Sequence, residues 1–401
     1  MADGWLSNVI VVVENPSDSH NLDRLRRVCR AFGVRELRLI QEAKEEDPRC
    51  RKALRLDPSV GRVVLNTAQC MQDLAREGIT SFATSLGSSV NLYDLRFDRR
   101  KMAFWFGQEK YGLTEEATQG ANERIFIPMS GMVQSLNVAV SAAVILAEVA
   151  RQVAFGLAPC PFASPIDPVE SSSRAERFLA IARRRQRGLV VVLEDPDRLD
   201  AAAILRSCDA FGVAEVHFIF ETSKAFDPLA NRQVTKSEGS NLWVCSRVFG
   251  SVAECRRCLD GFVHRRLAQG PSVLGSRLGE EPKLALWLTR RRDFEPLGLG
   301  PGADADADAD AADAAASDAG LAASGLAAAT LAELVRQRRS SASPESWCFG
   351  PEEQDAYVRW CEAVHAKRHT SLPQASLGEA EMSPEYERLG RLRAELARQG
   401  W

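Results

Sequence analysis

Short apolar runs alternate with amphipathic segments along the first 150 residues of the chain. The run VIVVV at 9–13 is continuously apolar, which is typical of a parallel strand buried on both faces. The segment NLDRLRRVCRAFG at 21–33 then has apolar residues at helical spacing, with Asn21 suited to the N-cap and Gly33 suited to the position after the helix. This alternation predicts an α/β fold in which helices cover both faces of a parallel sheet. The further predicted strands are 36–40, 81–86, 102–107 and 124–128, and the further predicted helices are 68–78, 113–120 and a long helix from about residue 137.

The same pattern begins again at residue 189. The sequence LVVVLEDPDRLDAAAILRSCDAFGVAEVHFIF repeats VIVVVENPSDSHNLDRLRRVCRAFGVRELRLI with one residue deleted, and such an internal repeat indicates two copies of one structural unit. The second copy continues with apolar segments at 241–261 and 284–289. A stretch rich in Gly, Ala and Asp interrupts this copy at about 297–344, and we do not expect that stretch to fold. We therefore expect the second copy to be degenerate.

Later segments predict that the second copy resumes after this insert. SWCFGPEEQ at 346–354 resembles AFWFGQEKY at 103–111, and SLPQASLG at 371–378 resembles a shortened FIPMSGMVQSLN. The C-terminal AELARQG resembles AEVARQV of the first copy. The sequence therefore predicts a first unit at 1–156, a linker at 157–187 and a degenerate second unit at 188–401.

Charge and composition add a few constraints. The net charge is −3, but without the Asp-Ala stretch at 303–314 the remainder is slightly basic. Basic clusters at 24–30, 183–187 and 289–292 are candidates for phosphate binding or for plain solvated surface. No apolar run approaches the roughly 20 residues that span a bilayer, and no signal sequence is evident, so we expect a cytoplasmic protein without a membrane partner. The ten cysteines are scattered, and the single C-x-x-C at 255–258 lacks a partner pair, so we expect packing rather than a metal site.

Polar residues follow three of the predicted strands. Ligands of open α/β sheets bind at the carboxyl ends of the strands, so residues 21–27, 107–112 and 127–137 are expected to converge at one edge. Each segment alone has a simpler structural interpretation, since Ser135 and Asn137 also suit a helix cap. Taken together, their order and spacing favour a functional site.

The motifs NLDRLRRVCRAFGV, FGQEKYGLTEEA and IPMSGMVQSLNVAVSAAVILAEVARQ carry a family resemblance. Residues 8–156 resemble the SpoU/TrmH branch of the SPOUT superfamily of RNA 2′-O-ribose methyltransferases, and within it the tRNA guanosine-18 2′-O-methyltransferases. The resemblance implies a deep trefoil knot and S-adenosylmethionine as cofactor. It implies that backbone groups of Gly107, Ile127 and Leu136 contact the cofactor, with Leu86 and Met129 nearby.

The resemblance also implies which residues act on the ribose. It places Arg27 at the 2′-hydroxyl, where a guanidinium that stays protonated can bind the neighbouring phosphate and stabilise developing alkoxide charge. Asn21, Glu109, Ser135 and Asn137 are expected to orient Arg27 and the ribose. The alternative for Arg27 is one more surface charge on an arginine-rich helix.

The second copy departs from these motifs. It keeps Arg206 at the position of Arg27, but Asp200 replaces Asn21 and Gly378 replaces Asn137. Glu352 and Ser376 are its other matching residues. We expect this copy to be catalytically weak or inactive.

The resemblance also implies a dimer, so the chain is expected to form either a homodimer or an intrachain pseudo-dimer of its two copies. The expected partner is RNA, with a tRNA guanosine in the D-loop preferred over ribosomal RNA. A non-enzymatic RNA-binding protein with relic methyltransferase domains is the third possibility.

Overall fold

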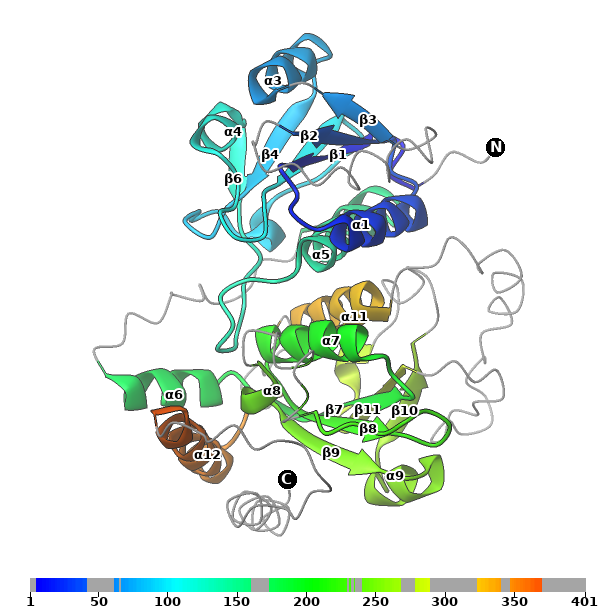
Figure 1. Ribbon diagram of the computed structural model, residues 1–401, viewed down its shortest axis with the longest axis vertical. Coiled ribbons are helices and arrows are strands. Elements are labelled where there is room, and N and C mark those ends of the chain that lie inside the picture. Colours follow the sequence, from blue (N-terminus) through cyan, green and yellow to red (C-terminus); the bar gives the residue numbers. More distant parts are fainter. Residues whose placement is uncertain are drawn as a thin grey trace.

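The computed structural model describes residues 5–41, 61–64, 66–159, 173–228, 231, 234, 240–267, 278–288, 323–339 and 347–369. These residues form two parallel sheets, each covered by helices (Figure 1). The α/β class with parallel sheets flanked by helices is therefore confirmed. Within the described residues, no helix is both long and apolar enough to cross a bilayer.

The first sheet has six strands in the order β3-β2-β1-β5-β4-β6, and every pairing is parallel. Alternate residues of β1 face opposite sides: Val11 packs towards α1 and α5, whereas Val12 packs towards α3 and α4. Both faces are buried, which explains the uninterrupted apolar run. The elements are β1 (Val9–Glu14), α1 (Ser19–Phe32), β2 (Glu36–Ile40), β3 (Gly61–Val64), α3 (Thr67–Arg76), β4 (Thr80–Thr84), β5 (Met102–Phe106), α4 (Glu115–Gly120), β6 (Glu123–Ile125) and α5 (Val138–Val153).

Helix α1 begins earlier than predicted. Its N-cap is Asp18, whose carboxylate accepts a hydrogen bond from the His20 amide, so Asn21 lies inside the first turn and not at the cap. The predicted end is confirmed, because Gly33 adopts the left-handed conformation with φ of 64°. This shift leaves the Asn21 side chain available for contacts with other segments.

The second sheet has five strands in the order β10-β11-β7-β8-β9, again all parallel. If β7 is matched to β1, then β8, β9, β10 and β11 correspond to β2, β3, β4 and β5, and the strand order is the same in both sheets. Within the described residues, the second sheet has no strand that corresponds to β6. The elements are α6 (Arg174–Ala182), β7 (Gln186–Glu194), α7 (Arg198–Ala210), β8 (Val213–Ile219), α8 (Ser240–Trp243), β9 (Cys245–Phe249), α9 (Val252–Cys258), β10 (Val263–Arg266), β11 (Leu284–Leu288), α11 (Ala323–Arg339) and α12 (Pro351–His369).

One sequence match in the second half, between 346–354 and 103–111, was wrong. The strand beside β7, in the place that β5 holds beside β1, is β11 with the sequence LALWL, and not the segment 346–354. Residues 351–369 are instead helix α12, and Glu352 is exposed on it. The proposed matches at Ser376, Gly378 and the C-terminal AELARQG lie outside the described residues.

Helices lie inside both the predicted linker and the predicted insert. Helix α6 falls inside the segment interpreted as a linker, and its start has a complete capping box between Ser173 and Glu176. Helix α11 falls inside the segment interpreted as unfolded. Its many alanines resemble low-complexity sequence, but Leu326, Leu331 and Leu334 are buried between other helices.

Helices α5 and α11 carry the same buried polar network. In α5, Glu148 accepts hydrogen bonds from Arg151 at 2.7 and 2.8 Å and from Gln152 at 2.7 Å. In α11, Glu333 accepts the corresponding bonds from residues three and four positions later, Arg336 at 2.5 and 2.7 Å and Gln337 at 2.8 Å. AELVRQ at 332–337 thus resembles AEVARQ at 147–152 both in sequence and in its hydrogen bonds.

The four helices α1, α5, α7 and α11 lie between the two sheets (Figure 1). Helix α5 packs against both α1 and α11, and α7 packs against α11. Their apolar side chains belong to one continuous core that also includes the inner faces of β1 and β7. The two halves of the chain are therefore joined by a shared hydrophobic core.

A carboxylate at this junction gives the protein a pH-dependent stability. Burial and the neighbouring Asp197 raise the pKa of Asp200 from 3.8 to about 6, against the opposing charge of Arg24 at 3.7 Å. Because this pKa is higher in the folded protein than in the unfolded chain, the folded protein binds more protons between about pH 4 and 6. The free energy of unfolding contributed by Asp200 therefore decreases as the pH rises through this window.

We expect Asp200→Asn to raise the free energy of unfolding at pH 8 by about 1–2 kcal/mol and to change it little near pH 4. Urea denaturation at the two pH values measures the difference. Asp260→Asn, at an exposed position, controls for the loss of one negative charge. An equal gain at both pH values would show that titration of Asp200 is not the cause.

Candidate active site

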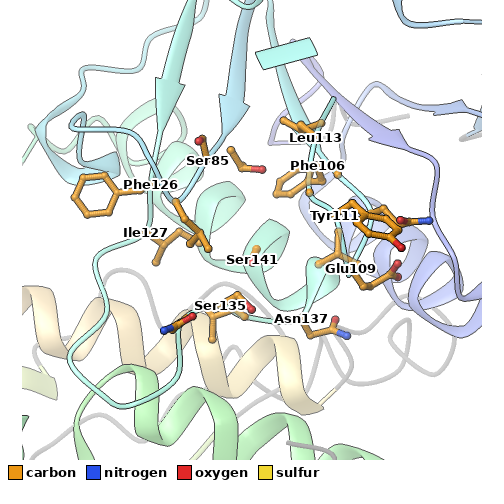
Figure 2. Close-up of a pocket in the computed structure, with 18 of the residues that line it drawn as sticks. Ser85, Phe106, Glu109, Tyr111, Leu113, Phe126, Ile127, Ser135, Asn137 and Ser141 are labelled. Atoms are coloured by element: carbon orange, nitrogen blue, oxygen red, sulfur yellow. The ribbon is translucent and has the colours of Figure 1, made fainter. Parts of the chain in front are cut away.

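A cavity of about 800 Å³ opens at the carboxyl ends of β4, β5 and β6 (Figure 2). Three separate stretches of the first half form most of its wall, and helix α7 of the second half adds Arg206. Glu109 and Tyr111 lie on one side, and Phe126 and Ile127 lie on the other. The lining residues are Asn21, Thr84, Ser85, Leu86, Gly87, Phe106 to Leu113, Thr118, Ile125, Phe126, Ile127, Met129, Gln134 to Val138, Ser141, Ile145 and Arg206.

Nine of the ten residues singled out in the sequence line this cavity. They are the five expected at the cofactor, Leu86, Gly107, Ile127, Met129 and Leu136, and four expected at the ribose, Asn21, Glu109, Ser135 and Asn137. The tenth, Arg27, is not among the lining residues. Its guanidinium is half exposed and pairs with Asp23 one turn earlier on α1, at 3.1 Å.

The loop after β5 is fixed by its own backbone. Gln108 and Gly112 exchange two backbone hydrogen bonds of 3.0 and 2.8 Å. A Cβ atom placed on Gly107 would lie 2.0 Å from the carbonyl carbon of Gly112, so only glycine fits there. At the end of the loop, the buried carboxylate of Glu14 accepts hydrogen bonds from the Thr114 amide and hydroxyl at 2.7 and 2.8 Å. The loop therefore presents a rigid wall to the cavity.

A chain of hydrogen bonds joins Asn21 of α1 to Glu109, in the loop after β5, and to Asn137, at the start of α5. The Glu109 carboxylate accepts hydrogen bonds from the backbone amide and the hydroxyl of Ser17 at 3.1 and 2.6 Å, and from the side-chain Nδ2 of Asn21 at 2.8 Å. The Asn21 oxygen in turn accepts from the Asn137 side chain at 2.8 Å. Asn137 also caps helix α5, because its oxygen accepts from the Ala139 amide at 3.0 Å. Asn137 thus both caps helix α5 and takes part in the hydrogen-bond chain of the site. Ser17 also belongs to this chain, and the sequence motifs did not identify it.

Arg206 reaches the cavity from the other half of the chain. Its Nε donates to the Ser135 carbonyl oxygen and its Nη2 donates to the Ser135 hydroxyl, both at 2.6 Å. Arg206 occupies the same place in α7 that Arg27 occupies in α1, six residues before the glycine that follows each helix. The sequence repeat predicted this equivalence, but it could not predict that the Arg206 side chain enters the cavity of the first half.

Two arginines of the basic cluster at 183–187 form ion pairs within the second half of the chain. Arg185 is fully buried, and it donates to the Asp209 carboxylate at 2.5 Å and to the Val213 carbonyl oxygen at 3.1 Å. Arg187 forms an ion pair with Glu353 at 3.0 Å. The cluster at 289–292 lies outside the described residues.

Comparisons with known proteins match the first half of the chain. Residues 8–147 match the model of the SpoU rRNA Methylase family. The tRNA (guanosine(18)-2′-O)-methyltransferase of Thermus thermophilus is 36% identical over 151 residues, which cover 36% of this chain and 75% of that enzyme. The enzyme of the same name from Escherichia coli K12 is 33% identical over 153 residues, which cover 36% of this chain and 64% of that enzyme.

Solved structures match the same part. One is the SpoU methyltransferase AviRb from Streptomyces viridochromogenes in complex with AdoMet, at 25% identity and a TM-score of 0.32, with 36% of this chain and 57% of that chain covered.

Proposed function

The chain belongs to the SpoU methylase family, and we propose that it transfers the methyl group of S-adenosylmethionine to a ribose 2′-hydroxyl of tRNA. The preferred target is a guanosine of the D-loop, because the relatives from Thermus thermophilus and Escherichia coli are named for guanosine 18. The main observation in support of this proposal is that three stretches of the first half and Arg206 of the second half line the same cavity.

The cavity residues fit the cofactor. Peptide groups of the stretches around Gly107, Ile127 and Leu136 offer donors and acceptors suited to an adenine ring, and the side chains of Leu86 and Met129 supply apolar surface. When bound, the cofactor supplies an electrophilic methyl group. The rigid loop at 107–112 helps to hold the reactants in line, and such placement lowers barriers by up to about 7–11 kcal/mol in well-oriented systems.

In this proposal Arg206, and not Arg27, acts on the ribose. A guanidinium remains protonated, so its role is to bind phosphate and to stabilise negative charge that develops on the 2′-oxygen. Arg206 is held at Ser135 by two hydrogen bonds, whereas Arg27 pairs with Asp23 away from the cavity. Asn21, Glu109 and Asn137 form the hydrogen-bonded chain that orients the polar side of the site.

We also propose that the two halves are tandem copies that form an intrachain pseudo-dimer. The matching strand orders, the equivalent networks on α5 and α11, and the helix layer between the sheets support this arrangement. The second half then takes the place of a partner subunit. The single chain would need no second molecule to complete the cavity.

A trefoil knot in the first half belongs to the same proposal. The stretches after β4 and β6 run together beyond their strands, since Phe126 donates to the Val90 carbonyl oxygen and accepts from the Leu92 amide, both at 3.0 Å. A knotted crossing at this point would bring the walls at 84–87, 106–113 and 125–138 around one ligand.

Labelled S-adenosylmethionine and unmodified RNA test the function. We expect incorporation of label into tRNA, mapped to the ribose of a D-loop guanosine, and no incorporation into a transcript with a 2′-deoxy nucleotide at that position. Incorporation into ribosomal RNA alone would transfer the assignment to rRNA. The absence both of incorporation and of heat on calorimetric titration with the cofactor would instead indicate a non-catalytic RNA-binding protein.

A further inference from the structure

The cavity loop between β6 and α5 reaches away from its own sheet and touches the second half of the chain. Figure 1 shows this teal loop extending towards α6, α7 and α8. The Ser130 amide donates to the Ala210 carbonyl oxygen at 2.6 Å, and the Ser130 hydroxyl accepts from Arg339 at 2.8 Å. The next residue, Gly131, passes so close to α7 that an added Cβ would lie 2.1 Å from the Asp209 carbonyl oxygen.

One buried carboxylate holds the following two residues. Oδ2 of Asp209 accepts hydrogen bonds from the Met132 and Val133 amides, both at 2.8 Å. The other oxygen, Oδ1, accepts from Arg185 at 2.5 Å, and neither side chain of this ion pair is exposed. Tyr357 of α12 joins the group as an acceptor from Arg185.

Such an ion pair is a poor source of net stability. Removing two charges from water costs several kcal/mol per ion, and this cost offsets much of their mutual attraction. What the carboxylate provides is a double acceptor at a fixed point, since an ionised carboxylate accepts hydrogen bonds at both oxygens. Here one oxygen faces the second half of the chain and the other faces the loop of the first half.

The anchored segment lies between residues that line the cavity. Ile127 and Met129 precede it, and Gln134, Ser135 and Leu136 follow it. A displacement of residues 130–133 would therefore move both of these walls.

We propose that Asp209 is a positioning residue through which the second copy fixes the shape of the cofactor cavity in the first copy. This inference rests on the proposed function for the identity of the ligand, S-adenosylmethionine. It also gives the second copy a role beyond Arg206, because residues 130–133 of the first copy are anchored to α7 and α11.

Two double variants of the full chain separate anchoring from the ion pair. Each variant carries Arg185→Met, combined with Asp209→Asn in one and with Asp209→Leu in the other. Both variants lack the buried charges, but only the Asn variant keeps a hydrogen-bond acceptor at position 209. Hydrogen exchange of the cofactor-free proteins reports on the loop directly. We expect the Leu variant to exchange the amides of residues 130–136 about tenfold or more faster than the Asn variant, with equal exchange in the β1 and β7 peptides.

Calorimetric titration with S-adenosylmethionine provides a second measurement. We expect the Leu variant to bind about tenfold or more weakly than the Asn variant. Equal loop exchange and equal affinity in the two variants would overturn the proposal. If the wild-type chain binds no cofactor but the loop exchange still differs, the anchoring role stands and the proposed function fails.

A glycine substitution covers the case in which the double variants do not fold. Gly131→Ala leaves both charges in place but forces the loop away from Asp209, so we expect the same faster exchange at 130–136. Gly250→Ala is the control, because an added Cβ there meets no atom within 4 Å. Unchanged exchange in the Gly131→Ala protein would contradict the proposal.

Discussion

Replacing Arg206 with alanine is expected to lower the rate of methyl transfer by about 10²–10³-fold, the usual cost of removing one donor that stabilises developing negative charge. Cofactor affinity should change by no more than a few fold, because the predicted cofactor-binding walls come from the first half of the chain. Single-turnover transfer of labelled methyl to tRNA, together with calorimetric titration of the cofactor, measures the two effects separately.

Arg27→Ala is the matched comparison for this result. The two arginines hold equivalent positions in α1 and α7, but Arg27 is half exposed and paired with Asp23. We expect the Arg27→Ala protein to transfer methyl groups at a rate within a few fold of the wild type. The reverse outcome, with Arg27 essential and Arg206 dispensable, would return the catalytic role to the residue predicted from the sequence motif.

Replacing Gly107 with alanine is expected to weaken cofactor binding by about 5–150-fold, the equivalent of the 1–3 kcal/mol that overpacking typically costs. The added Cβ would lie 2.0 Å from the Gly112 carbonyl carbon and 2.1 Å from the Leu113 nitrogen, and both are backbone atoms that cannot rotate away. The loop would have to open, and its rigid wall along the cavity would be lost.

Gly120→Ala is the control for this substitution. The atoms nearest to an added Cβ there belong to the Met71 side chain, at 3.5 Å or more, which is ordinary van der Waals contact. We expect its cofactor affinity to match that of the wild type in calorimetric titrations. Equal affinities in the Gly107→Ala and wild-type proteins would show that the loop after β5 does not shape the cofactor site.

Most of the first half could be predicted from its sequence. The apolar runs at 9–13 and 102–106 became the central strands β1 and β5, because strands buried on both faces need apolar side chains at every position. Strand β3 was missed, since GRVV at 61–64 is short and weakly apolar. Convergence at the sheet edge could be predicted because parallel strands bring their carboxyl ends together.

The sequence could not indicate which contacts cross between the halves. Arg27 and Arg206 hold corresponding positions in the sequence repeat, so the sequence does not distinguish them. Only the packing of α7 against the first half brings Arg206 to Ser135. Helix α11 was missed for a related reason. Its alanines are characteristic of low-complexity sequence, and they become a helix interface only where α5 and α7 cover them.

Native mass spectrometry of the full chain with S-adenosylmethionine tests most directly the claim that both halves of one molecule build one catalytic site. We expect a particle of one 44.0 kDa chain that carries one cofactor molecule. A particle of twice that mass as the cofactor-binding species, or two cofactors on one chain, would contradict it.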